Sequence, residues 1–358
     1  MASVFPIFCD GRSHRSRRLL IPLLLPCLAL LLSGCDRKQT LSLPISPAAG
    51  NEYFYLAQQK GFTAALGLEL KQPEFSEGTD VVEAYIREQT PLVSLTLEEV
   101  EQICGQVPER CPTIVLVIDE SRGADVLLAR PGIAGIAELR GKEISLSRSS
   151  HGLLLLGRAL EHEGFGFSQL NLRLLSGEGL LASMADGTSA AAVVSNPAHV
   201  RRLRELGMKP VLDSSRFPQE MFRVLAVEPG YLRQKRSAVE RLILAWRQAH
   251  RWSRLHHDQA CAVMATRAGH SRELFMEEEE GLHYPALNAQ RKLLARGGAV
   301  EVSLWRSRDL LQGLGQLQAE APLPRLDPTL VEEVLRRHPE PAPAATPKAA
   351  SGKPRQTH

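Results

Sequence analysis

From residue 40 to residue 227, short apolar segments with the composition of strands alternate with helical segments of roughly ten residues. Of all the features of the sequence, this alternation most narrows the possible fold classes. The run Thr113-Ile-Val-Leu-Val-Ile118 is typical of a strand that is buried on both faces. A second alternating unit begins near Arg140, and only helices are expected from Pro229 onward. Strands separated by such helices form mostly parallel sheets. We therefore expect an α/β fold with two lobes, each a mostly parallel sheet flanked by helices.

The apolar periodicity and the turn residues locate the individual elements. Strands are expected at 40–46, 68–71, 91–95, 113–118, 143–147, 171–175, 190–194, 210–212 and 223–227. Helices between them are expected at 52–60, 80–88, 153–163, 179–186 and 198–206. Thr96-Leu-Glu-Glu99 forms a capping box, which predicts that a helix begins there and runs to about Cys104.

The N-terminus has the pattern of a bacterial secretory signal. Four arginines precede an apolar run from residue 19 to residue 32, and Leu31-Leu-Ser-Gly-Cys35 resembles a lipobox. About 14 apolar residues are fewer than the roughly 20 that span a bilayer. We therefore expect residues 1–34 to be a signal peptide and Cys35 to be acylated, for example with palmitate. Asp36 favours retention at the periplasmic face of the inner membrane, in the cell envelope.

Removal of the signal leaves a chain without net charge. Residues 1–34 hold four of the 43 basic and one of the 40 acidic residues, so the remainder carries 39 of each. A neutral chain offers no broad field for polyanions, and we expect no nucleic-acid partner.

The cysteines outside the signal are Cys35, Cys104, Cys111 and Cys261. Cys104 and Cys111 flank a short loop and can pair in an oxidising envelope, and two independent thiols are the alternative. No Cys-x-x-Cys pair is present, and His256 and His257 would point about 100° apart on a helix. We therefore expect no metal site and no cofactor.

The body of the chain is expected to divide at changes in the element pattern. We predict a first lobe at 35–128, a second lobe at 129–227 and a helical return to the first lobe at 228–338. The hinge is expected at 126–130 and 221–227, where the chain crosses between the lobes. Residues 339–358 are rich in Pro, Ala, Lys and Thr, which predicts a disordered tail.

Several segments in order resemble the periplasmic solute-binding proteins of ABC importers for nitrate, sulfonates, taurine and pyrimidine precursors, with a type II periplasmic-binding fold. They are Gly50-Asn-Glu-Tyr-Phe-Tyr-Leu-Ala57, Leu95-Thr-Leu-Glu-Glu99, Ser121-Arg-Gly-Ala-Asp-Val-Leu-Leu-Ala129, Leu139-Arg-Gly-Lys142 and Leu212-Asp-Ser-Ser215. The chain departs from the family's usual residues at Ala48, Pro91, Leu153 and Asn196, which indicates a divergent pocket.

The resemblance and the fold together predict a ligand cleft at the strand ends. The expected contacts are Asn51, Tyr53, Thr96, Asp119, Arg148, Ser149, Ser150, His151, Asn196 and Glu220. Residues 148–152 precede a helix, so their amides, hydroxyls and arginine suit an anion, and ordinary helix capping is the alternative. A Tyr53 ring stacked on a planar solute and a Tyr53 buried in the first lobe both remain open. Asp119 and Glu98 suit a ligand cation, although Glu98 also suits a plain helix N-terminus. The acidic run 277–280 is expected to be solvated.

The predicted function is capture of a small polar or anionic solute and its delivery to ABC permease and ATPase subunits by a monomeric, lipid-anchored protein. A sensor or scaffold lipoprotein without transport is the alternative. Ser149, Ser150 and His151 are adjacent, but a catalytic triad needs a base and an acid placed across the fold, and we expect no enzyme.

Overall fold

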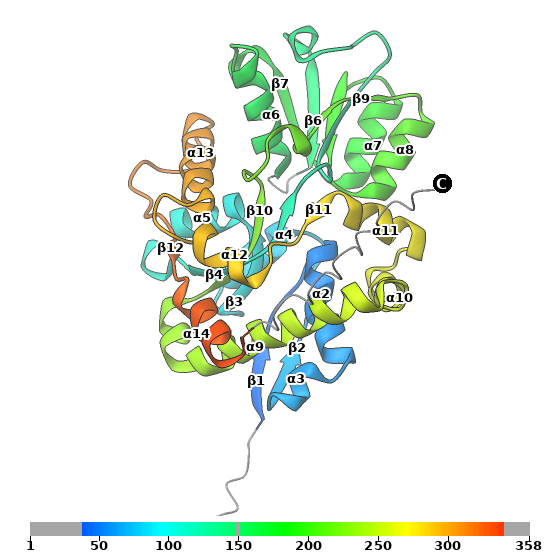
Figure 1. The fold of residues 1–358 in the computed structure, drawn as a ribbon. Helices are drawn as coiled ribbons and strands as arrows, with labels where there is room; N and C mark the ends of the chain where they lie inside the picture. Colours follow the sequence, from blue (N-terminus) through cyan, green and yellow to red (C-terminus); the bar gives the residue numbers. More distant parts are fainter. Residues whose placement is uncertain (1–37, 148–150, 340–358) are drawn as a thin grey trace, which may run out of the picture. The chain divides into compact units, whose positions relative to one another are not determined.

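The computed structural model describes residues 38–147 and 151–339. Its strands form a two-stranded sheet, β1–β2, and two five-stranded sheets. The first large sheet has the order β11-β4-β10-β3, with β12 beside β4, and the second has the order β7-β6-β8-β5-β9 (Figure 1). The expected two-lobe α/β class is confirmed.

The first lobe combines the small sheet and the first large sheet. Its strands are β1 (Gln39–Ser42), β2 (Leu68–Lys71), β3 (Leu92–Thr96), β4 (Thr113–Ser121), β10 (Phe222–Val227), β11 (Leu282–His283) and β12 (Arg325–Leu326). Its early helices are α2 (Ala49–Gln59), α3 (Phe62–Ala65), α4 (Gly78–Ile86) and α5 (Leu97–Gln106), followed by the 3₁₀ turn η1 (Pro108–Arg110).

The second lobe contains β5 (Val126–Ala129), β6 (Glu143–Ser147), β7 (Asn171–Leu175), β8 (Ala191–Val194) and β9 (Lys209–Asp213). Its helices are α6 (His151–His162), α7 (Gly177–Ala185) and α8 (Pro197–Glu205), with 3₁₀ turns η2 (Ile136–Leu139), η3 (Phe167–Gln169) and η4 (Ser214–Arg216). The helical return comprises α9 (Pro229–Leu255), α10 (His257–Ala268), α11 (Arg272–Glu280), α12 (Leu287–Leu293), α13 (Ala299–Gly313) and α14 (Thr329–Arg337). None of the helices in the described ranges is long and apolar enough to cross a membrane.

The sheets are mixed, whereas mostly parallel sheets were expected. The pairs β1–β2, β6–β7 and β6–β8 are parallel, but β10 is antiparallel to β3 and β4, and β5 is antiparallel to β8 and β9. The strands β5 and β10 each follow a crossing between the lobes and enter the new sheet in the opposite direction. The expectation of helices alone after Pro229 was also wrong, since β11 and β12 extend the sheet at β4.

Strand β4 is the centre of the first lobe. All nine of its residues are buried, as its continuous apolar run predicts, and it contacts helices α2 and α12. Trp246 of α9 and Phe54 of α2 belong to the largest core cluster, and each is at most 2 % exposed. Burial of one such side chain stabilises the fold by about 2–3 kcal/mol.

The crossings between the lobes lie just outside the predicted hinge. Residues 126–129 and 222–227 are strands β5 and β10 inside the two sheets, so the connecting segments are 122–125 and 214–221. These two segments are hydrogen-bonded to each other, since the Gly123 amide donates to Ser214 Oγ at 2.7 Å and the Ser214 amide donates to Asp125 O at 2.9 Å. The two connections between the lobes are therefore hydrogen-bonded to each other.

A disulfide joins Cys104 at the end of α5 to Cys111 after η1, with the Cα atoms 4.3 Å apart. We expect non-reducing digestion of the envelope form to yield one linked peptide, while buried Cys261 reacts with an alkylating reagent only after unfolding. Mass spectrometry that found Cys104 and Cys111 alkylated without reduction would contradict the pairing.

Candidate functional site

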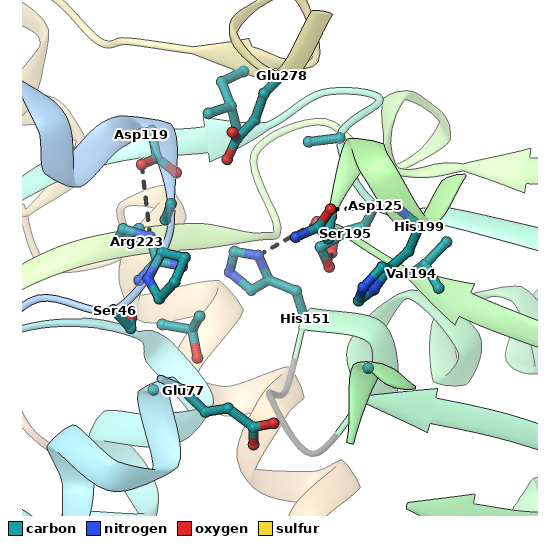
Figure 2. Close-up of a pocket in the computed structure, with 18 of the residues that line it drawn as sticks. Ser46, Glu77, Asp119, Asp125, His151, Val194, Ser195, His199, Arg223 and Glu278 are labelled. Carbon is teal, nitrogen blue, oxygen red and sulfur yellow. Dashed lines mark hydrogen bonds and ion pairs between the residues drawn. The ribbon is translucent and has the colours of Figure 1, made fainter. Parts of the chain in front are cut away.

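A cavity of about 220 Å³ is lined by residues from both lobes (Figure 2). Most of its lining is polar or ionisable. These side chains are Ser46, Ser76, Glu77, Thr96, Glu99, Asp119, Asp125, His151, Ser195, Asn196, His199, Arg223, His270 and Glu278. In Figure 2, Asp119 and Arg223 lie on one side, Asp125, Ser195 and His199 on the other, and His151 between them.

The N-termini of six helices reach the cavity. Its lining includes an N-cap or first-turn residue of α2, α4, α5, α6, α7 and α8. Four of these helices, α5 to α8, directly follow strands β3, β6, β7 and β8, so the site lies at the carboxyl ends of strands, as expected for an open α/β sheet. Helix N-termini favour negative charge and offer free amides.

The chain itself occupies several of these N-termini. Glu278 Oε1 accepts a hydrogen bond from the Ala49 amide of α2 at 2.9 Å. The predicted capping box at α5 is confirmed, because Glu99 Oε2 accepts from the Thr96 amide at 2.8 Å and Thr96 Oγ1 accepts from the Glu99 amide. Asn196 Oδ1 caps α8 in the same way. These helix ends therefore have less capacity for an anionic ligand.

Asp119 and Arg223 form the least satisfied polar pair of the cavity. Asp119 is 2 % exposed, and its Oδ2 lies 3.8 Å from Arg223 Nε, too far for a direct hydrogen bond. Asp119 Oδ2 and Arg223 Nη1 are both buried atoms without a hydrogen-bond partner in the described part of the chain. Burial raises the pKa of Asp119 to about 6, and the charge of Arg223 limits the rise. The pair offers one acceptor and one donor to a ligand.

Gly50 in the first turn of α2 makes room for the Asp119 carboxylate. A Cβ atom at this position would lie 1.9 Å from Asp119 Oδ2. Only glycine therefore allows the carboxylate to lie against the start of the helix. This contact explains why the segment that begins at Gly50 starts with a glycine.

Asp125 and His151 form a buried ion pair at the base of the cavity. His151 Nδ1 lies 3.4 Å from Asp125 Oδ2, and the carboxylate also accepts hydrogen bonds from the Ser121 and Ser195 hydroxyls. Burial opposes a charge on His151, but the charge and hydrogen bond of Asp125 outweigh it and raise the pKa of His151 to about 9. The same contacts, with those of the serines, outweigh burial and lower the pKa of Asp125. Both groups are therefore charged at neutral pH.

This ion pair connects the two lobes. Ser121 ends β4 in the first lobe, whereas Ser195 and His151 belong to the second lobe. The His151 Nε2 atom also lies 3.3 Å from the carbonyl oxygen of Phe222, on β10. Movement of one lobe against the other would therefore change the contacts of this ion pair.

Four of the predicted contacts line the cavity: Thr96, Asp119, His151 and Asn196. Three predicted contacts, Arg148, Ser149 and Ser150, lie outside the described residues, as does Cys35. The cavity thus combines predicted positions from both lobes.

Asn51, Tyr53 and Glu220 are not among the lining residues. Buried Asn51 donates from Nδ2 to Ser46 O at 2.8 Å and so holds a loop of the cavity wall. The Tyr53 ring stacks on His250 at 4.2 Å inside the first lobe, which is the buried alternative considered above. Glu220 forms ion pairs with Arg158 and Arg306. In the described part of the chain these three side chains contact other protein groups and do not line the cavity.

Sequence reasoning missed Asp125, Arg223, His199, His270 and Glu278 as lining residues. Two of them left a signal in the sequence. Arg223 is the one charged residue of strand β10, and Asp125 belongs to the Ser-x-Gly-Ala-Asp segment of the resemblance. His199 and Glu278 come from helices α8 and α11, and His270 comes from the turn between α10 and α11, so their relation to the cleft depends on tertiary packing.

The acidic run 277–280 is not simply solvated. Glu277 pairs with Arg201 of α8 at 2.8 Å, Glu278 caps α2 as described, and Glu279 is 9 % exposed and accepts a hydrogen bond from Tyr53 Oη at 2.8 Å. Helix α11 thus contacts the second lobe, the cavity and the first-lobe core with consecutive residues. The expectation of a solvated run was wrong because the sequence of α11 does not reveal that Glu277, Glu278 and Glu279 have partners in three different parts of the fold.

Two α/β lobes with a polar cavity at facing strand ends define the class of periplasmic solute-binding folds. The chain belongs to the NMT1/THI5-like family, whose model matches residues 51–260. Among curated protein sequences, none matches this chain.

Solved structures show the same fold at low identity. The periplasmic aliphatic sulphonate binding protein SsuA from Escherichia coli is 15 % identical with a TM-score of 0.66, covering 89 % of this chain and 98 % of that chain. The alkanesulfonate-binding protein SsuA from Xanthomonas axonopodis pv. citri, bound to MOPS, is 14 % identical with a TM-score of 0.64, covering 79 % and 96 %. A mutant of DszB in complex with biphenyl-2-sulfinic acid is 19 % identical with a TM-score of 0.61, covering 84 % and 100 %. DszB is a desulfurization enzyme, so binding proteins and an enzyme share this fold.

Proposed function

We propose that this protein is the lipid-anchored solute-binding subunit of an ABC importer, which captures a small polar organic solute between its lobes and delivers it to the permease. Family membership, the two-lobe fold and the polar cavity support this proposal. The periplasmic location of the named SsuA relatives agrees with the signal-like N-terminus.

The unsatisfied Asp119–Arg223 pair is the observation that carries the proposal. A buried polar atom without a partner costs about 1–3 kcal/mol, and a ligand that supplies the partner recovers that cost. Asp119 requires a donor or a cation, and Arg223 requires an acceptor or an anion. The favoured solute therefore carries a nitrogen donor group beside an acceptor group, rather than an anionic group alone.

The occupied helix N-termini support the same choice of solute. The Glu278 and Glu99 carboxylates already accept from the amides of α2 and Thr96, so a sulfonate or nitrate would meet negative charge there. A solute with a positive or donor-rich part faces no such repulsion near Asp119. The anionic part of the solute belongs beside Arg223 and the protonated His151.

A binding role also fits the geometry of His151 better than catalysis does. Its pKa of about 9 keeps the imidazole protonated at neutral pH, so it is a poor general base. Asp125 lies between Ser195 and His151, whereas a triad needs the histidine in the middle. Among the described residues, no serine hydroxyl is hydrogen-bonded to the His151 ring.

The lipid anchor predicts a simple change in fractionation. We expect Cys35→Ala to release the protein from membranes, because the thiol that would carry the acyl chain is lost. Immunoblots of membrane and soluble fractions measure the shift, with Cys261→Ser as a control that stays in the membrane fraction. A Cys35→Ala variant that remained membrane-bound would contradict the anchor.

The solute is identified by a thermal-shift screen of the purified protein. The panel contains matched pairs of solutes: amino-sulfonates against alkanesulfonates, amino acids against carboxylates, and aminopyrimidines against unsubstituted pyrimidines. We expect stabilisation by members that carry both groups. Stabilisation by the purely anionic members alone would contradict the assigned pair, and catalytic turnover of a bound solute would contradict a pure binding role.

A further inference from the structure

Helices α10 and α11 bring three different metal-binding side chains together away from the cavity lining. His257 and Cys261 lie four residues apart on α10, which places them on one face, and Glu279 approaches from α11. Cys261 Sγ lies 3.7 Å from both ring nitrogens of His257 and 3.3 Å from Glu279 Oε2. All three ligand atoms lie within 4.8 Å of one another.

The two separations from Cys261 Sγ match those around a tetrahedral metal ion, and the His257 and Glu279 ligand atoms lie within 4.8 Å of each other. Zinc bonds of about 2.0–2.3 Å to nitrogen, sulfur and oxygen place neighbouring ligand atoms about 3.5 Å apart. The measured separations of 3.7 Å and 3.3 Å bracket that value. His257 is exposed, so its ring can turn to present either nitrogen and the site can be reached from solvent.

The surroundings of Glu279 provide a second, independent observation. This carboxylate is 9 % exposed, and the ion pairs found among the described residues include none for it. Tyr53 and Tyr284 both donate to its Oε1, at 2.8 Å and 3.3 Å, which leaves Oε2 directed toward Cys261. A buried carboxylate without a cation is costly, and hydrogen bonds that orient a ligand from behind are typical of metal sites.

We propose that His257, Cys261 and Glu279 form a binding site for a divalent transition metal ion of the zinc type. Imidazole, thiolate and carboxylate together suit zinc and cobalt better than magnesium or calcium. On binding, the Cys261 sulfur loses its proton to solvent and the ion neutralises Glu279. Three protein ligands leave a fourth position for water.

The metal would hold α10 and α11 together next to the cleft. Glu278 and Glu277, the residues before Glu279, contact α2 and α8. Occupancy of the site would therefore restrain a helix that contacts both lobes. No metal was expected because no Cys-x-x-Cys pair or other His/Cys spacing suggested zinc, and the proposal rests instead on the His257-x-x-x-Cys261 spacing together with Glu279.

Cobalt titration tests the site. The full chain is purified in detergent, stripped with a chelator and titrated with Co²⁺. We expect a thiolate-to-cobalt charge-transfer band, which Zn²⁺ removes by displacement. Cys261→Ser should abolish the band, while the other cysteines stay the same in every variant.

Further variants separate ligation from folding. His257→Ala changes an exposed residue, and Glu279→Gln keeps the shape of the side chain, so we expect both to fold and to weaken Co²⁺ binding at least about tenfold. His256→Ala, at the neighbouring exposed histidine, should bind like the wild type. Absence of the band in the wild type, its persistence in Cys261→Ser, or equal loss in His256→Ala and His257→Ala would overturn the proposal.

Discussion

Replacing Asp125 by alanine is expected to lower the free energy of unfolding by about 3–5 kcal/mol, because the protonated His151 ring loses its buried partner. The pKa of about 9 for His151 corresponds to about 3 kcal/mol of favourable interaction, which agrees with this range. Urea unfolding of the ligand-free protein at pH 7 measures the loss. Asp125→Asn should cost less, because its side-chain amide oxygen still accepts a hydrogen bond from a serine hydroxyl.

The effect of Asp125→Ala depends on pH in a defined direction. The raised pKa of His151 contributes stability that is complete below pH 6.5 and is lost as pH rises through 9. The lowered pKa of Asp125 contributes stability that is lost at acid pH, as the carboxyl is protonated. Wild type and Asp125→Ala should therefore differ most between about pH 4 and pH 6.5, and the difference should shrink as pH rises through 9. A constant difference across this range would contradict the ion pair.

An exposed ion pair provides the control. Glu83 of α4 and Arg87, the C-cap residue of that helix, form an ion pair at 2.7 Å, with more than 60 % of each side chain exposed. Glu83→Ala should change the free energy of unfolding by less than about 1 kcal/mol, since solvent screens such pairs. Equal losses in Glu83→Ala and Asp125→Ala would show that burial of the second pair has no effect.

Replacing Asp119 by asparagine is expected to weaken the affinity for the solute about tenfold to hundredfold. The change removes a charge-assisted contact worth about 1.5–3 kcal/mol and keeps the shape of the side chain. Titration calorimetry with the solute from the screen measures the change. Asp213→Asn, at an acidic residue outside the cavity lining, is the matched control and should bind like the wild type.

The affinity for the solute should also follow the ionisation of Asp119. Burial raises the pKa of this carboxyl to about 6, so the charged form that accepts from the solute is lost below that value. We expect wild-type affinity to fall as pH decreases from 7 to 5 and Asp119→Asn to show a flatter profile. An equally steep loss in the variant would assign the pH dependence to another group.

The strands were easier to predict than the direction in which they pair. Strand β4 was located by its uninterrupted apolar run, and the α5 boundary by the Thr96–Glu99 capping box, because both signals are local. The sequence did not predict that β5 and β10 are each antiparallel to their neighbours in the two sheets. The direction in which such a strand enters its sheet depends on the crossing between the lobes that precedes it. The connections between the lobes lie a few residues away from the expected hinge segments for the same reason.

The candidate site was predictable where its residues follow strands. Asp119 lies near the end of β4, and His151 is the first residue of α6, the helix after β6. Both were predicted in this way. Tyr53 was ambiguous, because an aromatic residue on α2 suits both a stacked ligand and a core, and contacts with His250 and Tyr284 on distant segments decide between them. Glu278 and His270 come from the helical return, about 150 residues after Asp119, so no local pattern connects them to the cleft.

Closure of the lobes on the solute is the central claim, and small-angle X-ray scattering tests it most directly. The radius of gyration of the wild-type protein is measured without solute and with the solute at a concentration that calorimetry shows to be saturating. We predict a smaller radius with solute, because Asp119 and Arg223 of the first lobe and His151 of the second would contact the same molecule. An unchanged radius at saturation would contradict capture between the lobes.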